Sequence, residues 1–294
     1  MPHHARLHLP TSALGACVFL GVERDTRGLQ LTDSERFNYY PATPLVTISW
    51  VLHGALHMVE DSALPAPEAT LAPALPRVVI AGPHLTPSAS WSPGPVHALS
   101  VSFYPDALMH LLGTSVEPLV DKIVPLQDVV NCPLLARLAQ VGVLQEGALF
   151  QQIQTILQLL WLDLHRDWEL PTLRGWVQAM AVRAAFTKSG ADIRRAQRRF
   201  KDWTGQSYRD LQLFVRTERA MTHASAQPLA EALDLASVAA KAGFSDQSHM
   251  GREVRRVTGL SPGRLRELMR SDEAFWFYRL LGDHLRVPGA PEPL

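Results

Sequence analysis

Two short segments of the chain carry cationic and amide side chains at a spacing that suits one face of a helix. The repeating positions are Arg194, Arg198 and Lys201 in the first segment, and Ser248, Arg252 and Arg255 in the second. Arginine can hydrogen-bond to base edges in the major groove of DNA, and further cations can contact phosphates. One arginine-rich helix face is usually only solvated, but two faces of the same build predict a surface for double-stranded DNA.

The two segments are copies of one unit. Residues 182–207 align with residues 236–261, and this register pairs Asp192/Asp246, Arg198/Arg252, Lys201/Arg255, Thr204/Thr258, Gly205/Gly259 and Ser207/Ser261. In each copy an Asp would cap the start of the helix, and a Gly would end it in the left-handed conformation. The buried stripes are expected at Ile193, Ala196, Phe200 and Trp203, and at Met250, Val254 and Val257. The repeat therefore predicts two helix-turn-helix units.

The stretch GFSDQSHMGREVRRVTGLSP resembles the second helix-turn-helix of AraC/XylS-type transcription regulators, and IRRAQRRFKDWTGQSYRDL resembles the first recognition helix with its linker helix. The resemblance covers about residues 171–270 and implies a sequence-specific, ligand-responsive, DNA-binding transcription regulator. It implies base contacts from Arg194, Gln197, Arg198, Gln247, Ser248, His249 and Arg252, and phosphate contacts from Arg195, Lys201 and Arg255.

The chain departs from the family pattern at three places. The family usually carries Phe where Met250 and Val254 stand, and the segment before the first recognition helix lacks the usual pattern and holds Trp176. These departures keep one alternative open, a small-molecule-binding β-domain protein with a vestigial helix-turn-helix. A separate alternative is an architectural protein that binds DNA without sequence preference.

The N-terminal half has the composition of β-structure. Residues 45–60 suggest a bent strand or hairpin broken at Gly54, RVVIAGP suggests a buried strand, and residues 96–103 suggest another after a turn at Pro93-Gly94. The stretch GPHLTPSASWSPGPVHALSVSFYPDALMHLLG resembles the cupin-like N-terminal domains of some AraC-type regulators. That resemblance implies a sensor or dimerisation domain. The expected fold class is α+β, with a small barrel or sandwich followed by an all-α module.

Helical patterns follow from Pro105, beginning with DALMHLLG and short amphipathic pieces over residues 117–144. The longest pattern covers residues 148–168. Residues 207–224 match a linker helix that would hold the two reading helices about one turn of DNA, ~34 Å, apart. Residues 274–282 predict a terminal aromatic helix packed on the C-terminal module. The expected domains are residues 1–168, residues 169–282 and a disordered tail over 283–294.

Charge separates the two halves of the chain although the whole is neutral. Residues 171–282 hold 19 Lys+Arg and 11 Asp+Glu, a balance of +8, whereas the remainder holds 9 and 17, a balance of −8. A basic C-terminal module beside an acidic N-terminal half fits a DNA-binding protein with a separate sensing domain.

Other kinds of chemistry find little support in the residues. A metal site could be drawn from His53, His57, Glu60, His84 and His97, but Glu60 has the wrong strand parity and Gly54 interrupts the strand. Two cysteines, Cys17 and Cys132, make no disulfide framework, and catalytic and phosphate-loop motifs are absent. We therefore expect no enzyme activity, no metal and no cofactor.

The expected setting of the protein follows from the same residues. The N-terminus MPHHARLHLP has no apolar core of a signal peptide, and no apolar run reaches membrane-spanning length. We expect a cytoplasmic protein that binds double-stranded DNA without a membrane. A small-molecule effector, RNA polymerase and a second copy in a homodimer are its possible further partners.

Overall fold

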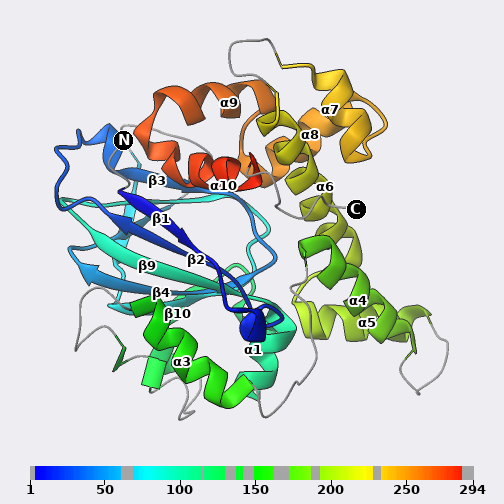
Figure 1. The fold of residues 1–294 in the computed structure, drawn as a ribbon, viewed down its shortest axis with the longest axis horizontal. Coiled ribbons are helices and arrows are strands. Elements are labelled where there is room, and N and C mark those ends of the chain that lie inside the picture. The colour runs from blue at the N-terminus through cyan, green and yellow to red at the C-terminus, as the bar shows by residue number, and fades with distance from the viewer. Residues whose placement is uncertain are drawn as a thin grey trace.

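The protein is described from a computed structural model, which covers residues 4–60, 69–113, 115–129, 137–138, 140–141, 149–161, 172–186, 193–227 and 233–286. The strands gather in the N-terminal part of the chain, on the left in Figure 1, and most of the C-terminal helices lie along its right and upper sides. The predicted α+β class and the order of β-rich and helical parts are confirmed.

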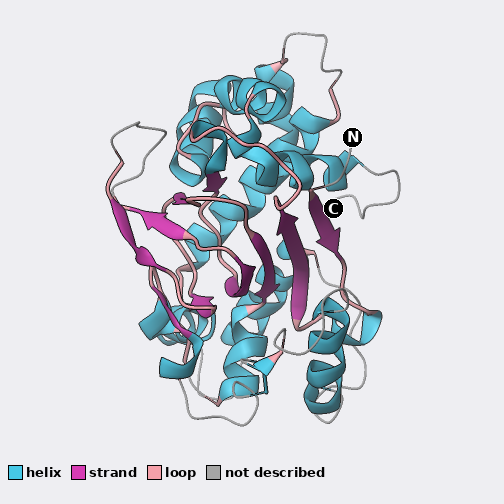
Figure 2. Ribbon diagram, turned by 90° about the vertical axis from the view of Figure 1, so that its left-hand side faces the viewer, coloured by secondary structure: helices cyan, strands magenta, loops and turns pink. Residues whose placement is uncertain are grey.

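Among the described residues, ten strands form two antiparallel sheets, and Figure 2 shows the strands in magenta. The six-stranded sheet has the order β1 (Ala5–His8), β2 (Val18–Asp25), β9 (His97–Phe103), β4 (Val46–His53), β7 (Val78–Ala81) and β10 (Ile123–Pro125). The four-stranded sheet has the order β3 (Phe37–Tyr40), β8 (Ser88–Trp91), β5 (His57–Val59) and β6 (Leu71–Ala74). Along β9 every second side chain is buried, as expected of a strand with one face on a core.

The chain passes from one sheet to the other at Gly54. The expected bent strand over residues 45–60 is therefore two strands, and these two do not pair as a hairpin, because β4 bonds to β9 and β7 while β5 bonds to β6 and β8. Gly54 has a φ of 77°, and a Cβ there would lie 2.3 Å from the carbonyl oxygen of Pro95. Only glycine fits this turn without moving the backbone.

The segment after the β-rich part is less helical than the sequence suggests. Helix α1 (Pro105–Leu112) forms as expected, but residues 117–128 contain a 3-10 turn (Glu117–Leu119), strand β10 and a second 3-10 turn (Leu126–Asp128). β10 pairs with β7 and forms one edge of the six-stranded sheet, and this pairing outweighs the local amphipathic pattern. The longest expected helix appears as α3 (Leu149–Trp161); the residues from 162 to its expected end lie outside the described part.

Within its described residues, the C-terminal part of the chain consists of helices joined by turns and loops. Its helices are α4 (Leu173–Phe186), α5 (Ile193–Thr204), α6 (Tyr208–Ser225), α7 (Leu235–Ala242), α8 (Gln247–Thr258), α9 (Pro262–Ser271) and α10 (Trp276–Arg286). None of the described helices is both long and apolar enough to cross a bilayer. α10 continues past Gly282, so residues 283–286 belong to a helix and not to the expected tail, while residues 287–294 lie outside the described part. Gly282 does not adopt a positive φ, so the backbone has no reason to leave the helix there.

One apolar core runs through the β-rich part and into the first helices of the C-terminal part. It joins Trp50 and Phe103 of the six-stranded sheet to Trp176 of α4, Phe200 of α5 and Phe214 of α6. Because these side chains share one buried cluster, burial of α4 and α5 depends on the β-rich part as well as on their own neighbours.

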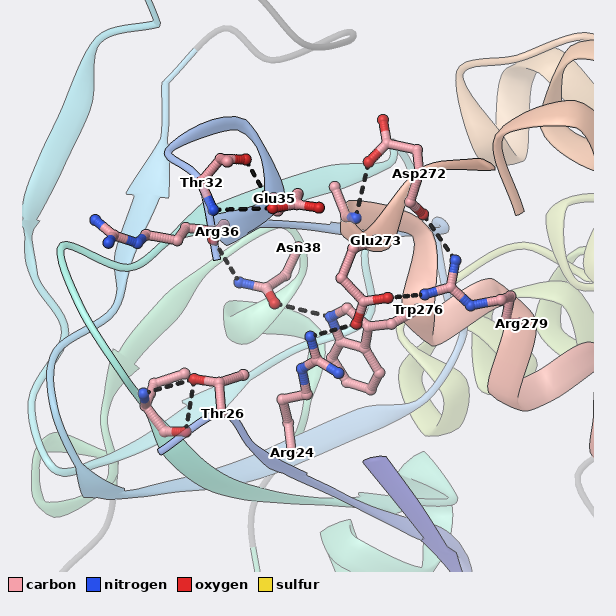
Figure 3. A network of polar contacts seen from close by, with 12 residues as sticks. Arg24, Thr26, Thr32, Glu35, Arg36, Asn38, Asp272, Glu273, Trp276 and Arg279 are labelled. Atoms are coloured by element: carbon pink, nitrogen blue, oxygen red, sulfur yellow. Dashed lines mark hydrogen bonds and ion pairs between the residues drawn. The ribbon is translucent and has the colours of Figure 1, made fainter. Parts of the chain in front are cut away.

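The terminal aromatic helix packs where the two parts meet. The prediction that it packs on the C-terminal module is right only in part, because α10 contacts β1 and β3 as well as α6 and α9. Phe275 stacks on Tyr39 with ring centroids 4.8 Å apart, and the Trp276 indole donates a 2.8 Å hydrogen bond to Asn38 Oδ1. Figure 3 shows this contact beside an ion pair of 2.7 Å between Arg24 of β2 and Glu273. The rings of Phe275 and Trp276 are both buried in this contact.

Candidate nucleic-acid interface

Helix α8 has the build of a recognition helix. Asp246 caps its start, accepting a 2.7 Å hydrogen bond from the His249 backbone N–H, and Gly259 ends it with a φ of 78°. The hydrogen bond from the His249 N–H holds the pKa of the Asp246 carboxyl below its ordinary value. The capping Asp and the terminal Gly predicted from the sequence are both confirmed.

The two faces of α8 are sharply different. Met250, Val254 and Val257 are buried, as the sequence predicts. The opposite face exposes Gln247, Ser248, Arg252 and Arg255. A shallow depression runs along this face, lined by Ser248, Gly251, Arg252, Arg255 and Ser261. Side chains that can read bases and contact phosphates thus surround a concave strip of surface.

His249 has a local role at the start of α8. Its Nδ1 lies 3.0 Å from Ser245 Oγ, and its ring packs edge-on against Phe244. The ring is half-buried and its Nε2 lies 4.0 Å from a Glu253 carboxylate oxygen. The geometry thus gives His249 contacts that position the first turn of the helix.

Helix α5 repeats this plan with one exception. Arg194, Arg195, Gln197, Arg198 and Lys201 are exposed, whereas Phe200 is only 3% exposed. The prediction that Ile193 belongs to the buried stripe is wrong, because its side chain is 73% exposed. Ile193 is the first residue of α5 and lies about one turn before the half-buried Ala196. The buried face of the helix therefore begins after Ile193.

The ends of α5 and α8 are built alike, which confirms the repeat in three dimensions. Thr204 Oγ1 lies 2.8 Å from the Phe200 carbonyl oxygen and 2.9 Å from that of Gln206. Thr258 Oγ1 lies 2.8 Å from the carbonyl oxygen of Val254 and 3.1 Å from that of Leu260. Gly205 has a φ of 75°, matching Gly259, and Ser207 and Ser261 cap the helices that follow. Asp192 lies outside the described residues.

The linker helix α6 holds the two units together, as the sequence predicts. Asp210 in its first turn accepts a 3.0 Å hydrogen bond from the Arg256 guanidinium of α8, and the two groups form an ion pair. Arg219 further along donates to the Lys241 carbonyl at 3.1 Å, at the end of α7. The guanidinium of Arg216 lies 5.4 Å from the centre of the Phe244 ring in the turn of the second unit. These contacts fix α7 and α8 along α6.

The β-rich part also contacts both candidate reading helices. Lys201 Nζ of α5 lies 3.6 Å from Glu117 Oε1, and the Ala42 N–H donates a 2.8 Å hydrogen bond to the Val257 carbonyl of α8. Sequence reasoning missed both contacts, since the partners lie far apart in the chain and belong to different kinds of structure. The predicted phosphate-contacting residue Lys201 therefore has a carboxylate partner within the protein.

Trp176 also makes contacts that could not be predicted from the sequence. Its indole is buried and donates a 2.7 Å hydrogen bond to Asp106 Oδ1 at the start of α1. Its ring also lies 5.3 Å from that of Tyr104. Burial raises the pKa of Asp106 above its ordinary value, and the indole N–H opposes that rise. The unusual tryptophan thus joins the first helix-turn-helix to the β-rich part.

The histidines considered for a metal site are dispersed among other partners. His97 Nε2 lies 2.8 Å from Glu23, His57 Nδ1 lies 2.9 Å from the Ala72 carbonyl oxygen, and His84 Nδ1 lies 2.7 Å from that of Gly82. Burial would raise the pKa of Glu23, but hydrogen bonds from His97 and His8 bring it below its ordinary value. Within the described part of the chain, no group of three or more His, Cys, Asp or Glu side chains could hold a metal ion.

Comparison with known proteins supports the reading of the helical part. Residues 187–268 match a family model described as a helix-turn-helix domain. No curated protein matches the chain. Similar solved structures include ToxT from Vibrio cholerae O395, with 11% identity, 79% of this chain and 94% of that chain covered and a TM-score of 0.35.

Two other ToxT structures from Vibrio cholerae strain SCE256 show similarity of the same order. An apo single-residue variant has 11% identity, 88% and 98% coverage and a TM-score of 0.38. The wild-type protein bound to an unsaturated fatty acid has 11% identity, 78% and 94% coverage and a TM-score of 0.32. Because these whole-chain scores are low, the match over residues 187–268 stands by itself. In that region the chain carries a helix-turn-helix domain.

Proposed function

We propose that the protein is a sequence-specific DNA-binding transcription regulator. The observation that carries the proposal is the two-faced build of α8, whose buried Met250 and Val254 fix the helix while Arg252 and Arg255 remain exposed. A recognition helix needs such a fixed position, since its side chains must reach base edges with little freedom. We propose no catalytic activity for this chain.

The exposed residues sort into two roles. Gln247, Ser248 and Arg252 on α8 would contact bases, and Arg255 at the other end of the helix would contact phosphate. On α5 the corresponding base contacts would come from Arg194, Gln197 and Arg198, with phosphate contacts from Arg195 and Lys201. His249 would be the least free of the base-contacting residues, because its ring already packs against Phe244.

The length of the linker helix supports a double reader. α6 has 18 residues, which corresponds to about 27 Å at 1.5 Å per residue. Adjacent major-groove segments on one side of B-DNA are ~34 Å apart. A rigid helix of this length, with α5 before it and α8 tied to it through Arg256, is of the right order to span that interval.

The β-rich part would serve as the sensor of the regulator. It contacts α5 through Glu117 and α8 through the Ala42 backbone, so a change in its packing would act on both reading helices. We propose residues 1–168 as this sensor and dimerisation domain and residues 169–282 as the DNA-binding domain. In this role the protein would act in the cytoplasm, where RNA polymerase and a small-molecule effector would be its further partners.

Substitution of one residue from each role tests the proposal. Arg252→Ala should relax preference at particular base pairs and cost about 1–3 kcal/mol of discrimination, since a bidentate arginine–guanine contact is lost. Lys201→Ala should weaken binding to all sequences alike and make the salt dependence less steep. Both effects can be measured by fluorescence anisotropy with duplexes from a randomised library over a salt series.

A third variant uses the ion pair found in the structure. Glu117→Gln removes the carboxylate that competes with phosphate for Lys201, so it should strengthen binding to all duplexes without changing base preference. The same Glu117→Gln change in a Lys201→Ala background should have little effect. If Arg252→Ala and Lys201→Ala changed base preference and salt dependence in the same way, the assignment of roles would be wrong.

A further inference from the structure

A cavity lies inside the helical part, behind the reading face of α8. Its volume is about 340 Å³, and its walls come from α6, α7, α8, α9 and α10. It lies between two apolar clusters, one containing Val238 and Met250 and the other containing Leu265 with Met269 packed against it. The helices that carry the second reading unit therefore surround a space that side chains do not fill.

The walls of this cavity are apolar and adaptable. The apolar lining residues are Ala220, Met221, Ala224, Val238, Met250, Val254, Pro262, Leu265 and Met269. Three of them are methionines, whose flexible and polarisable side chains adjust to ligands of different shape. Cavities of 300 Å³ and more with mainly apolar walls are of the size that holds small organic molecules.

The rim of the cavity is basic. Arg266, Arg270 and Arg279 face it together with one acid, Asp283. Arg279 is held in place by a 2.8 Å hydrogen bond to the Asp272 carbonyl, and Arg266 by one of 3.3 Å to the Gln227 carbonyl. Glu273 is not part of the rim but pairs with Arg279, so three guanidinium groups stand against two carboxylates. The remaining excess of one positive charge favours a negatively charged group at the mouth of an otherwise apolar space.

We propose that this cavity binds a small amphipathic anion, with an apolar body between α6, α8 and α9 and one carboxylate or sulfonate at the arginine rim. The apolar walls account for the body of the ligand, and the excess of positive charge accounts for its head. A neutral molecule of the same shape would gain only the first of these two contributions.

Occupancy of the cavity would act on DNA reading, a step that depends on the function proposed above. Met250 and Val254 line the cavity and also form the buried stripe of α8, whose other face carries Arg252. A ligand in the cavity would therefore contact the recognition helix from behind. If its binding shifts α8, the coupling is reciprocal, so DNA and ligand change each other's affinity by the same factor.

The binding step can be tested without DNA on the full-length protein. The probes are 8-anilinonaphthalene-1-sulfonate, which carries one sulfonate, and N-phenyl-1-naphthylamine, which has the same aromatic body without a charge. Their fluorescence rises in apolar surroundings, so titration gives a dissociation constant for each. The variants are Ala224→Phe, which fills the cavity, and Arg270→Gln, which removes a charge from its rim.

We expect Ala224→Phe to weaken both probes at least tenfold, because a phenyl ring would occupy their site. Arg270→Gln should weaken the sulfonate probe about fivefold and the neutral probe less than twofold. Arg264→Gln is the matched control, since Arg264 is on the same helix but outside the cavity, and it should leave both probes unchanged. Wild-type affinity of the sulfonate probe for both Ala224→Phe and Arg270→Gln would overturn the proposal.

Hydrogen exchange separates this proposal from the function on which its regulatory step depends. Addition of the sulfonate probe should slow exchange of the α8 amides in the native chain and in Arg264→Gln, and should have no effect in Ala224→Phe. If the probe protects α8 but no duplex binds, the cavity stands and the regulator function fails. If duplexes bind and the probe leaves α8 exchange unchanged, the cavity proposal fails alone.

Discussion

The ion pair between Arg24 and Glu273 should contribute measurably to stability, because it joins the two parts of the chain in a sheltered place. The Arg24 side chain is 7% exposed and that of Glu273 29% exposed, and the closest atoms are 2.7 Å apart. Glu273 also pairs with Arg279, and the Arg24 guanidinium lies 4.9 Å from the centre of the Trp276 ring. Figure 3 shows these groups as one network.

The magnitude follows from the burial of the two partners. Loss of one partner from a fully buried pair costs about 3–5 kcal/mol, because the other charge is left without compensation. Since Glu273 keeps some contact with water, we expect Glu273→Gln to lower the free energy of unfolding by about 2–3 kcal/mol. Arg24→Met should cost less, about 1–2 kcal/mol, because it leaves no buried cation behind.

A double-mutant cycle isolates the interaction, and the chain supplies a matched control. Arg264 and Glu267 of α9 also lie 2.7 Å apart, but their side chains are 53% and 62% exposed. Urea unfolding followed by circular dichroism at pH 7 should give a coupling of about 1–2 kcal/mol for Arg24 with Glu273. The coupling for the exposed pair should be below about 0.5 kcal/mol. Equal couplings for the two pairs would refute the argument that burial decides the strength of the contact.

Two further predictions concern α7 and α6. Asp234→Ala should lower the free energy of unfolding by about 1 kcal/mol in urea titrations, because Asp234 accepts a 3.0 Å hydrogen bond from the Ser237 N–H at the start of α7. Asp234→Asn keeps an acceptor and should cost only a few tenths of a kcal/mol, so similar losses for both would contradict the capping role. Burial raises the pKa of Glu218 on α6 from 4.5 to about 7, so the unfolded state ionises first and stability falls as the pH rises from about 4.5 to 7. Glu218→Gln should therefore raise the free energy of unfolding by about 3 kcal/mol at pH 8 and much less at pH 4.5. An equal gain at both values would show that ionisation is not the cause.

The helix-turn-helix part could be predicted from the sequence because its signals are local. The capping Asp246, the terminal Gly259 and the buried stripe through Met250 and Val254 each depend on residues a few positions apart. Such signals suffice to set the ends and the inward face of a short helix. The same reasoning failed at Ile193, which continues the apolar stripe of Phe200 but is 73% exposed at the first residue of α5.

The contacts between the two parts could not be predicted, because they depend on long-range packing. The stretch VFLGVERD shows no clear alternation of polar and apolar residues, yet it forms β2, which pairs with both β1 and β9. The aromatic residues of α10 suggested burial but not the partner, and their contacts with Asn38 and Tyr39 appear only in the fold. The ion pair between Lys201 and Glu117 likewise has no sequence signature.

Sequence-specific reading of DNA by α5 and α8 can be measured by selecting bound duplexes from a randomised library with the full-length protein and determining their affinity over a salt series. We expect one motif with two recognised blocks about 10 base pairs apart, and Arg252→Ala should weaken the block read by α8. Salt-sensitive binding without a preferred motif, or no binding at all, would contradict this expectation.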